Sequence, residues 1–210
     1  MHPARVLDLG LCDYLAAWRV QQDLLDARHE DRVVDTLVLV EHPHVLTVGR
    51  GGHRANLIAP GDMPVIEVER GGAVTYHGPG QLVGYPILRL RENERDVHRY
   101  LRNLEQALMS TLADFAITGE QRPGLTGVWA GPHKLASIGV AVRRRWITMH
   151  GFALNVCTDL GRFAAINPCG LPASVMGSMT SVLGRLVTIA EVREPLLRHL
   201  SLALNRDWHA

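Results

Sequence analysis

One glycine-rich stretch constrains this chain more than any other part of the sequence. It runs Arg70-Gly-Gly-Ala-Val-Thr-Tyr-His-Gly-Pro-Gly-Gln81 and holds four glycines and one proline in twelve residues. Apolar runs at 63–68 and 82–90 flank it and read as strands. A plain hairpin turn needs two to five mostly small residues. The length and varied polar groups favour a loop that cradles a substrate with its backbone N–H groups, with an ordinary long hairpin loop as the alternative.

Composition narrows the function classes. A chain of 210 residues with a hydrophobic fraction of 47% can form a single domain over 1–210. Its 22 basic residues nearly balance its 21 acidic ones, which argues against a nucleic-acid partner. No apolar run is long enough for a membrane span, and the start does not read as a signal peptide. Three widely spaced cysteines indicate free thiols and a cytoplasmic location.

The remaining periodicities predict an α+β domain, a mixed β-sheet with packed helices. Helices are expected at 14–28, 96–115 and 188–204, and Pro195 should kink or restart the last of them. Further strands are expected at 35–41, 45–48, 128–130, 135–142 and 146–156. A turn is expected at 124–127, and a basic hairpin tip at Arg143-Arg144-Arg145.

The cysteines and the single lysine suggest a nucleophile. Cys12 and Cys157 lie in or beside apolar segments, where cysteine usually acts as a small core residue. Cys169 lies in the turn Asn167-Pro-Cys-Gly170, where we expect it to be reachable. Lys134 is the only lysine, and lysine can shift its pKa and exchange a proton where arginine cannot. Lys134 is therefore a candidate partner for Cys169, with a solvated lysine at a strand end as the plain alternative.

The histidines do not form a recognisable metal motif. The chain has eleven of them, but no H-E-x-x-H, no C-x-x-C and no clustered carboxylates. We therefore expect no metal and no cofactor. His77, inside the glycine-rich stretch, is the histidine most expected to contact substrate.

Four spaced motifs resemble the lipoyl(octanoyl) transferase family of lipoate biosynthesis. They are the stretch from Arg70 to Gln81, His133-Lys-Leu-Ala-Ser-Ile-Gly139, His150-Gly-Phe-Ala-Leu-Asn155 and Pro168-Cys-Gly170. The resemblance runs from about Tyr14 to the closing helix. His44 stands where the family usually has a second proline, and Phe152 replaces a more usual leucine, which could alter the acyl pocket.

The resemblance implies a fold, a reaction and a set of site residues. The fold is that of the biotin/lipoate protein ligases. The reaction moves an octanoyl group from octanoyl-acyl carrier protein to a lysine of lipoyl domains, in 2-oxoacid dehydrogenase E2 subunits and the glycine cleavage H protein. Cys169 would carry the acyl group and Lys134 would be its partner. The implied substrate-binding residues are Arg70, Gly71, Gly72, Ala73, Val74, Thr75, Tyr76, His77, Ser137, Ile138, Gly139, Gly151, Phe152 and Ala153.

The chemistry of these residues agrees with acyl transfer through a covalent intermediate. Lys134 would favour the thiolate and move protons, and backbone N–H groups at Gly78 or Cys169 could hold the oxyanion. The sequence leaves open whether His77 or His150 assists. Two rival functions remain, an ATP-dependent lipoate or biotin ligase, which needs no cysteine, and a non-catalytic protein that binds acyl carriers.

Overall fold

The structure is a computed structural model that describes residues 1–209. The side chains of Arg54 and Cys169 lie outside its described part. The helices are α1 (Tyr14–His29), α2 (Val97–Ala113), α3 (Met179–Leu183) and α4 (Ile189–Leu204). The strands are β1 (His2–Leu11), β2 (Asp35–Glu41), β3 (Val45–Val48), β4 (Val65–Glu67), β5 (Val74–His77), β6 (Gln81–Ile87), β7 (Glu120–Arg122), β8 (Leu125–Ala130), β9 (His133–Arg143), β10 (Ile147–Asn155) and β11 (Arg206–His209).

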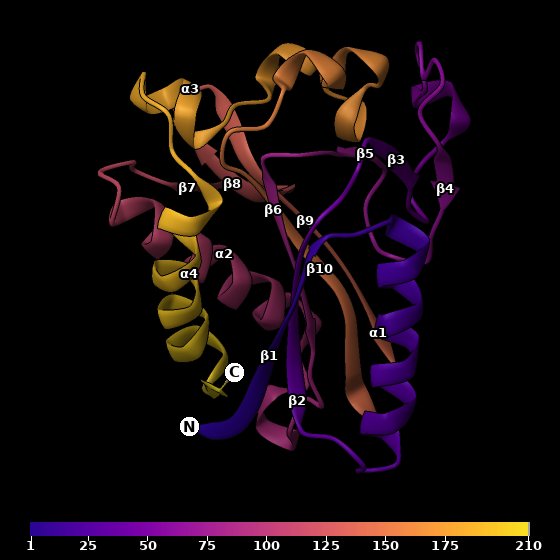
Figure 1. The fold of residues 1–210 in the computed structure, drawn as a ribbon, viewed down its shortest axis with the longest axis vertical. Coiled ribbons are helices and arrows are strands. Elements are labelled where there is room, and N and C mark those ends of the chain that lie inside the picture. The colour runs from indigo at the N-terminus through magenta and orange to yellow at the C-terminus, as the bar shows by residue number, and fades with distance from the viewer. Residues whose placement is uncertain (210) are drawn as a thin grey trace.

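Eight of these strands form one mixed sheet in the order β11-β1-β2-β6-β10-β9-β8-β7. β1 runs parallel to both β2 and β11, whereas the other neighbours are antiparallel. Helices α2 and α4 lie on one side of this sheet and α1 lies on the other (Figure 1). Both faces are therefore covered, which explains why nearly every residue of β2, β6 and β10 is buried.

Each long helix begins at a capping residue that the sequence supplies. The Asp13 carboxylate accepts from the N–H groups of Leu15 and Ala16, and the Asp96 carboxylate accepts from that of Arg99. Thr188 and Glu191 form a capping box at the start of α4. The main core lies between the sheet and the pair α2–α4, and a second core lies under α1.

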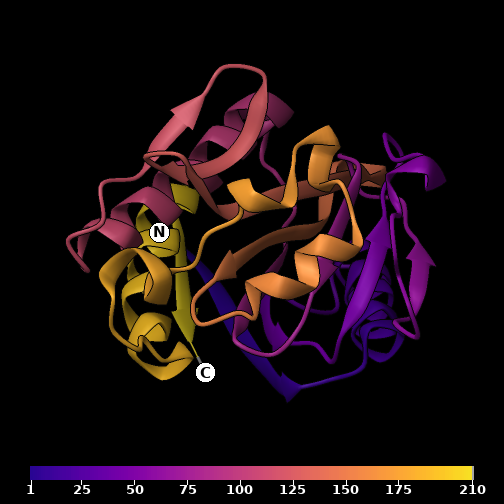
Figure 2. The ribbon, with the colours of Figure 1, turned by 90° about the horizontal axis from the view of Figure 1, so that it is seen from above.

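A second, three-stranded sheet has the order β4-β3-β5 and carries its own core. The segment that follows β10 crosses over the upper ends of the strands toward this small sheet, as the view from above shows (Figure 2). The segment is held there at several points. Ile166 bridges to Leu57, the Asn167 N–H donates to the Asn56 carbonyl at 2.8 Å, and the turn Pro168–Gly170 packs against β5.

The structure confirms the α+β class and the expected helices, with four corrections. Residues 74–77, expected within a loop, form strand β5 because β3 provides a backbone partner and Tyr76 fills the core of the small sheet. The turn expected at 124–127 is confined to 123–124, and β8 begins at Leu125. Pro195 does not restart α4, which is one continuous helix. Strands β1, β7 and β11 were not expected.

Candidate active site

A cavity opens beside the sheet where β5, β9 and β10 come together. It encloses about 500 Å³, its open mouth included. Eleven of the fourteen predicted substrate-binding residues line it, namely Arg70, Gly72, Val74, Thr75, His77, Ser137, Ile138, Gly139, Gly151, Phe152 and Ala153. Lys134 and His150 line it as well. Motifs that are up to about eighty residues apart in the sequence therefore share one apolar cavity, as a binding site for an aliphatic group requires.

Three predicted residues lie outside this cavity. The Tyr76 ring packs edge-on against Phe163 in the core of the small sheet, and its hydroxyl lies 2.8 Å from His44 Nδ1. Burial raises the pKa of Tyr76 to about 12, which keeps it neutral. Gly71 and Ala73 line a neighbouring groove instead.

Arg70 fixes the glycine-rich loop to β3. Its guanidinium donates to the Thr47 carbonyl and hydroxyl, both at 2.9 Å, and to the Gly71 carbonyl at 3.0 Å. The Gly71 N–H then donates to the Val140 carbonyl of β9 at 2.9 Å. A Cβ on Gly139 would lie 2.6 Å from the Gly71 carbonyl oxygen, so only glycine lets the glycine-rich loop approach β9 this closely.

His77 is a neutral, oriented histidine. Gln81 Nε2 donates to Asn155 Oδ1 at 2.8 Å, so its Oε1 is free to accept from His77 Nδ1, 2.7 Å away. That assignment places the proton on Nδ1 and leaves Nε2 as the acceptor. Burial lowers the pKa of His77 to about 3. His77 therefore accepts a hydrogen bond at neutral pH and does not act as an acid.

Lys134 lies in a slot that a glycine makes possible. Its side chain is 3% exposed, and a Cβ on Gly127 would lie 2.7 Å from its Cε. Gly127 has φ +133°, and its N–H donates to Glu105 Oε1 at 2.9 Å. Glu105 is fully buried on α2 and also pairs with Arg102 at 2.5 Å. The Lys134 ammonium also lies 5.8 Å from the centre of the Trp129 ring, within range of a cation–π contact.

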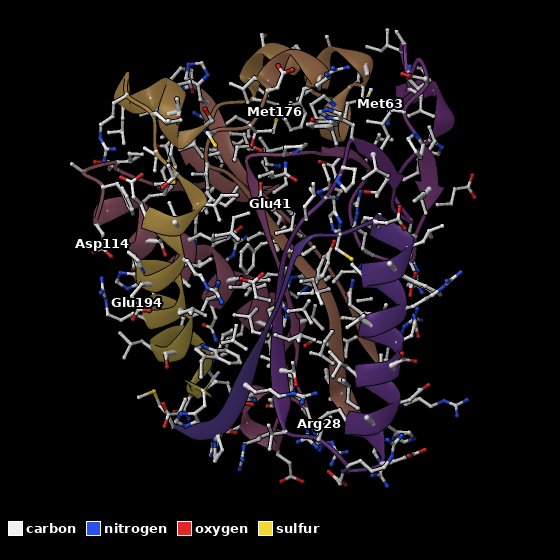
Figure 3. All side chains as sticks on the ribbon, in the orientation of Figure 1. Arg28, Glu41, Met63, Asp114, Met176 and Glu194 are labelled. Carbon is white, nitrogen blue, oxygen red and sulfur yellow. The ribbon has the colours of Figure 1, made fainter. Side chains whose placement is uncertain are left out.

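The segment that carries Cys169 is tied to Lys134 through the backbone. Residue 169 lies in the short 3-10 turn Pro168–Gly170, in which Pro168 is buried and Gly170 is exposed. Farther along the same segment, Met176 bridges to Lys134, and the Gly177 N–H donates to the Lys134 carbonyl at 3.0 Å. Met176 lies at the upper ends of the strands (Figure 3). Because the Cys169 side chain lies outside the described residues, its role stays a prediction.

The other two cysteines occupy ordinary positions. Cys12 and Cys157 are half-buried free thiols. Burial, assisted by the nearby Glu41 carboxylate, raises the pKa of Cys157, so this thiol stays protonated at neutral pH. Within the part of the chain that the structure describes, no cluster of His, Cys, Asp and Glu could hold a metal ion, and no helix is long and apolar enough to cross a membrane.

His150 lies in the cavity wall with a strained backbone. Its φ is +58°, and its N–H donates to Gln21 Oε1 at 3.0 Å, which ties β10 to α1. Its buried ring nitrogens have no hydrogen-bond partner among the described residues, and the Glu69 carboxylate lies 3.7 Å from Nε2. Burial lowers the pKa of His150 to about 4, although Glu69 opposes this shift. At neutral pH His150 therefore presents an uncharged ring to the cavity.

Sequence reasoning missed three residues that line the cavity, Tyr14, Val83 and Tyr85. Tyr85 belongs to a buried polar chain with His42, in which His42 Nδ1–H donates to the Cys12 carbonyl at 2.8 Å and Nε2 accepts from Tyr85 at 2.8 Å. The Tyr14 ring lies beside this chain, with its centre 5.0 Å from that of His42. Because the Tyr85 hydroxyl has a partner of its own, the two tyrosine rings can form an apolar wall. Tyr14 begins α1 and Tyr85 lies in β6, so no local motif marked them.

Comparison with known proteins agrees with the geometry. A family model described as the lipoyl protein ligase A/B catalytic domain matches residues 13–201. An octanoyltransferase from Geobacter metallireducens is 50% identical over 188 residues, which cover 90% of this chain and 87% of that protein. An octanoyltransferase from Gloeobacter violaceus is 52% identical over 180 residues, covering 84% of this chain and 80% of that protein.

Solved structures show the same fold at low identity. A bipartite lipoate protein ligase from Thermoplasma acidophilum aligns with a TM-score of 0.75 at 19% identity, over 100% of this chain and 86% of that one. A biotin protein ligase from Aquifex aeolicus aligns with a TM-score of 0.59 at 11% identity, over 96% and 70% of the two chains. The expected biotin/lipoate protein ligase-like fold is confirmed, and the chain belongs to the octanoyltransferases within the lipoyl protein ligase A/B catalytic domain family.

Proposed function

We propose that this protein transfers an octanoyl group from octanoyl-acyl carrier protein to the lysine of lipoyl domains, through a thioester on Cys169. The observation that carries the proposal is the placement of a buried lysine, Lys134, in the wall of an apolar cavity and in backbone contact with Met176 and Gly177, which follow the Pro168–Gly170 turn in the same segment. The mostly apolar lining of this cavity suits an aliphatic chain. Membership among the octanoyltransferases supports the same reaction.

In the first step the Cys169 thiolate attacks the carbonyl carbon of the donor thioester. A carbon–sulfur bond to Cys169 forms, the bond to the carrier sulfur breaks, and Lys134 gives a proton to the leaving thiolate. Lys134 is then neutral. In the second step the acceptor amine attacks the acyl-enzyme, Lys134 takes a proton from that amine, and the Cys169 thiolate leaves. Backbone N–H groups at Gly78 or Cys169 remain the candidates for stabilising the oxyanion.

Neutral histidines fit this scheme as positioning groups. With pKa values of about 3 and about 4, His77 and His150 are uncharged at neutral pH, so neither competes with Lys134 as a cation. The acceptors that we propose are lipoyl domains of 2-oxoacid dehydrogenase E2 subunits and the glycine cleavage H protein. The lipoate protein ligase from Thermoplasma acidophilum, which has the same fold, is described together with its E2 lipoyl domain, and this pairing supports lipoyl domains as the acceptor class.

Intact mass after incubation with octanoyl-acyl carrier protein tests the covalent step. The unaltered protein should gain one octanoyl group without ATP. Cys169→Ser should gain none, whereas Cys12→Ser and Cys157→Ser should load normally, because those half-buried thiols lie outside the cavity lining. Normal loading of the Cys169→Ser variant would contradict the proposal. A requirement for ATP, with release of pyrophosphate, would favour the ligase reaction instead.

Lys134→Arg tests the proton-transfer role. Arginine keeps the positive charge that favours a thiolate but cannot release a proton near pH 7. We expect both half-reactions to slow, with transfer to the lipoyl domain falling at least about a hundredfold, within the range of general acid–base catalysis. Acyl-enzyme formation and transfer should be followed separately by mass spectrometry. Native rates in both steps would exclude the proton shuttle.

A further inference from the structure

A second groove reaches Lys134 from the side of the sheet that faces α2. It encloses about 900 Å³ with its open mouth, and it shares Gly72, Lys134, Ile138 and Gly139 with the acyl cavity. The two spaces therefore adjoin at the reacting centre. An acyl transfer needs space on two sides of one carbonyl carbon, one side for the acyl chain and the other for the incoming nucleophile.

The groove exists because β9 loses its neighbour partway along. β8 pairs with β9 only from Gly127 opposite Ser137 to Ala130 opposite His133. Beyond that point the next contact on this edge is the glycine-rich loop, whose Gly71 N–H donates to the Val140 carbonyl at 2.9 Å. A gap is left between the start of β8 and the loop, and the first turns of α2 line it.

The lining of the groove identifies the kind of group that fits it. Val97, Leu101 and Leu125 are half-buried aliphatic residues that face this space. None of the described residues that line it is acidic. Aliphatic walls suit the four-methylene stem of a lysine. The arm of an acyl carrier contains amide groups, which such walls would leave without hydrogen-bond partners.

Burial in the groove also favours the neutral form of an acceptor amine. An ammonium group that enters an apolar groove meets a desolvation penalty. Desolvation lowers the pKa of the incoming amine, and no carboxylate in the described lining opposes it. The groove therefore favours the neutral amine, which is the form that attacks a thioester.

We propose that this groove receives the acceptor lysine of the lipoyl domain and delivers it to the acyl-enzyme in neutral form. The inference rests on the proposed function, since it presupposes an acyl group on Cys169. It adds the route of the second substrate, with Val97, Leu101 and Leu125 as the residues that determine whether a protein-borne lysine can enter.

A single-turnover experiment separates this groove from the reacting centre. The enzyme is first loaded to completion with S-octanoyl-N-acetylcysteamine, and the acyl-enzyme is then mixed with either a lipoyl domain or hydroxylamine. Val97→Trp should obstruct the groove at its half-buried rim, and Leu125→Trp should obstruct it from the other wall. We expect transfer to the lipoyl domain to fall at least tenfold in each variant, while cleavage by the small hydroxylamine stays within twofold of the unaltered rate.

Leu186→Trp is the matched control, because Leu186 is 66% exposed and lies outside the groove. It should leave both rates unchanged. Unaltered transfer to the lipoyl domain in both groove variants would overturn the inference, as would an equal loss with hydroxylamine, which would locate the damage at the centre. Failure of the unaltered enzyme to form any thioester would instead refute the proposed function, and the inference would fall with it.

Discussion

Single glycines determine where the reactive groups of this enzyme can lie. Gly127 is the clearest case, because a Cβ there would lie 2.7 Å from the Lys134 side chain and 2.4 Å from the Ala136 carbonyl oxygen. The buried carboxylate of Glu105 holds the Gly127 N–H. Glu105 on α2 thereby fixes the backbone of Gly127, and Gly127 leaves room for the Lys134 amine. Glu105 itself lines neither cavity.

We expect Ala153 to limit the length of the acyl chain that the cavity accepts. It is 5% exposed, lines the cavity and packs with the core under α1, whereas Phe152 points to the core on the other side of the sheet. Each buried CH₂ contributes about 0.8 kcal/mol, so binding alone would favour ever longer chains, and only a closed end sets a maximum. Ala153→Leu fills part of that space and should shift the preference from octanoyl toward hexanoyl.

The measurement is the relative kcat/KM for hexanoyl, octanoyl and decanoyl carrier protein in both forms. Circular dichroism and thermal melting should first show that the variant is folded. An unchanged order of preference in a folded variant would mean that the acyl chain ends elsewhere in the cavity. Tyr14 and Tyr85 line the same cavity as Ala153.

At the scale of elements, sequence patterns located most helices and strands but not all. Capping residues are local signals, and Asp96 and Thr188 cap α2 and α4 at the positions where the sequence predicted these helices to begin. Strands β1 and β11 depend on each other, since His2 pairs with Arg206 from the far end of the chain. No local periodicity reveals such a pairing. Strand β5 was missed for a similar reason, because glycines surround it and its partner β3 supplies its order.

The C-terminal strand is anchored by one buried arginine, which gives a prediction for stability. Arg206 is 1% exposed and donates to Asp35 at 2.6 Å and to Glu94 at 2.8 Å and 2.9 Å. Arg206→Ala leaves the buried Asp35 carboxylate without that partner, so we expect a loss of about 3–5 kcal/mol in the free energy of unfolding by urea.

A matched control comes from an exposed pair. Arg162→Ala removes the 3.5 Å contact with Asp159, in which both side chains are about half exposed. Surface pairs of this kind contribute at most about 1 kcal/mol, so this variant should unfold close to the native midpoint. Equal effects of the two substitutions would show that Arg206 does not anchor β11 as we infer.

At the scale of the whole molecule, the site combines short motifs with distant contributions. Three of the four motifs predicted most of the cavity lining, because each of the three contains residues that line the cavity. Tyr14 comes from α1 and Tyr85 from β6. Glu69, whose carboxylate lies 3.7 Å from His150 Nε2, comes from the end of the small sheet, and only the tertiary fold brings these residues together. The cavity is therefore a property of two sheets and a helix, and sequence spacing alone could not supply its walls.

The buried histidines of this cavity predict how stability depends on pH. Burial lowers the pKa of His77 to about 3 and that of His150 to about 4. In the unfolded chain both should titrate near 6.5. Between pH 6.5 and about 4 the unfolded state therefore binds protons that the folded state does not bind. The contribution of these histidines to the free energy of unfolding is thus fully present well above pH 6.5 and is lost as the pH decreases.

Each histidine contributes a slope of at most about 1.4 kcal/mol per pH unit, reached well below pH 6.5, so the pair should remove about 3 kcal/mol between pH 6.5 and 5. Carboxylates whose pKa is lowered, such as Glu69 and Glu94, lose their contribution only below this window, as the pH falls past the ordinary range of their pKa. Urea unfolding at pH 7.5, 6.5, 5.5 and 5.0 measures the slope. His150→Gln should reduce it by the share of one histidine, at most about 1.4 kcal/mol per pH unit. A free energy of unfolding that stays flat from pH 7.5 to 5.0 would contradict the assignment of two neutral, buried histidines to the wall of the acyl cavity.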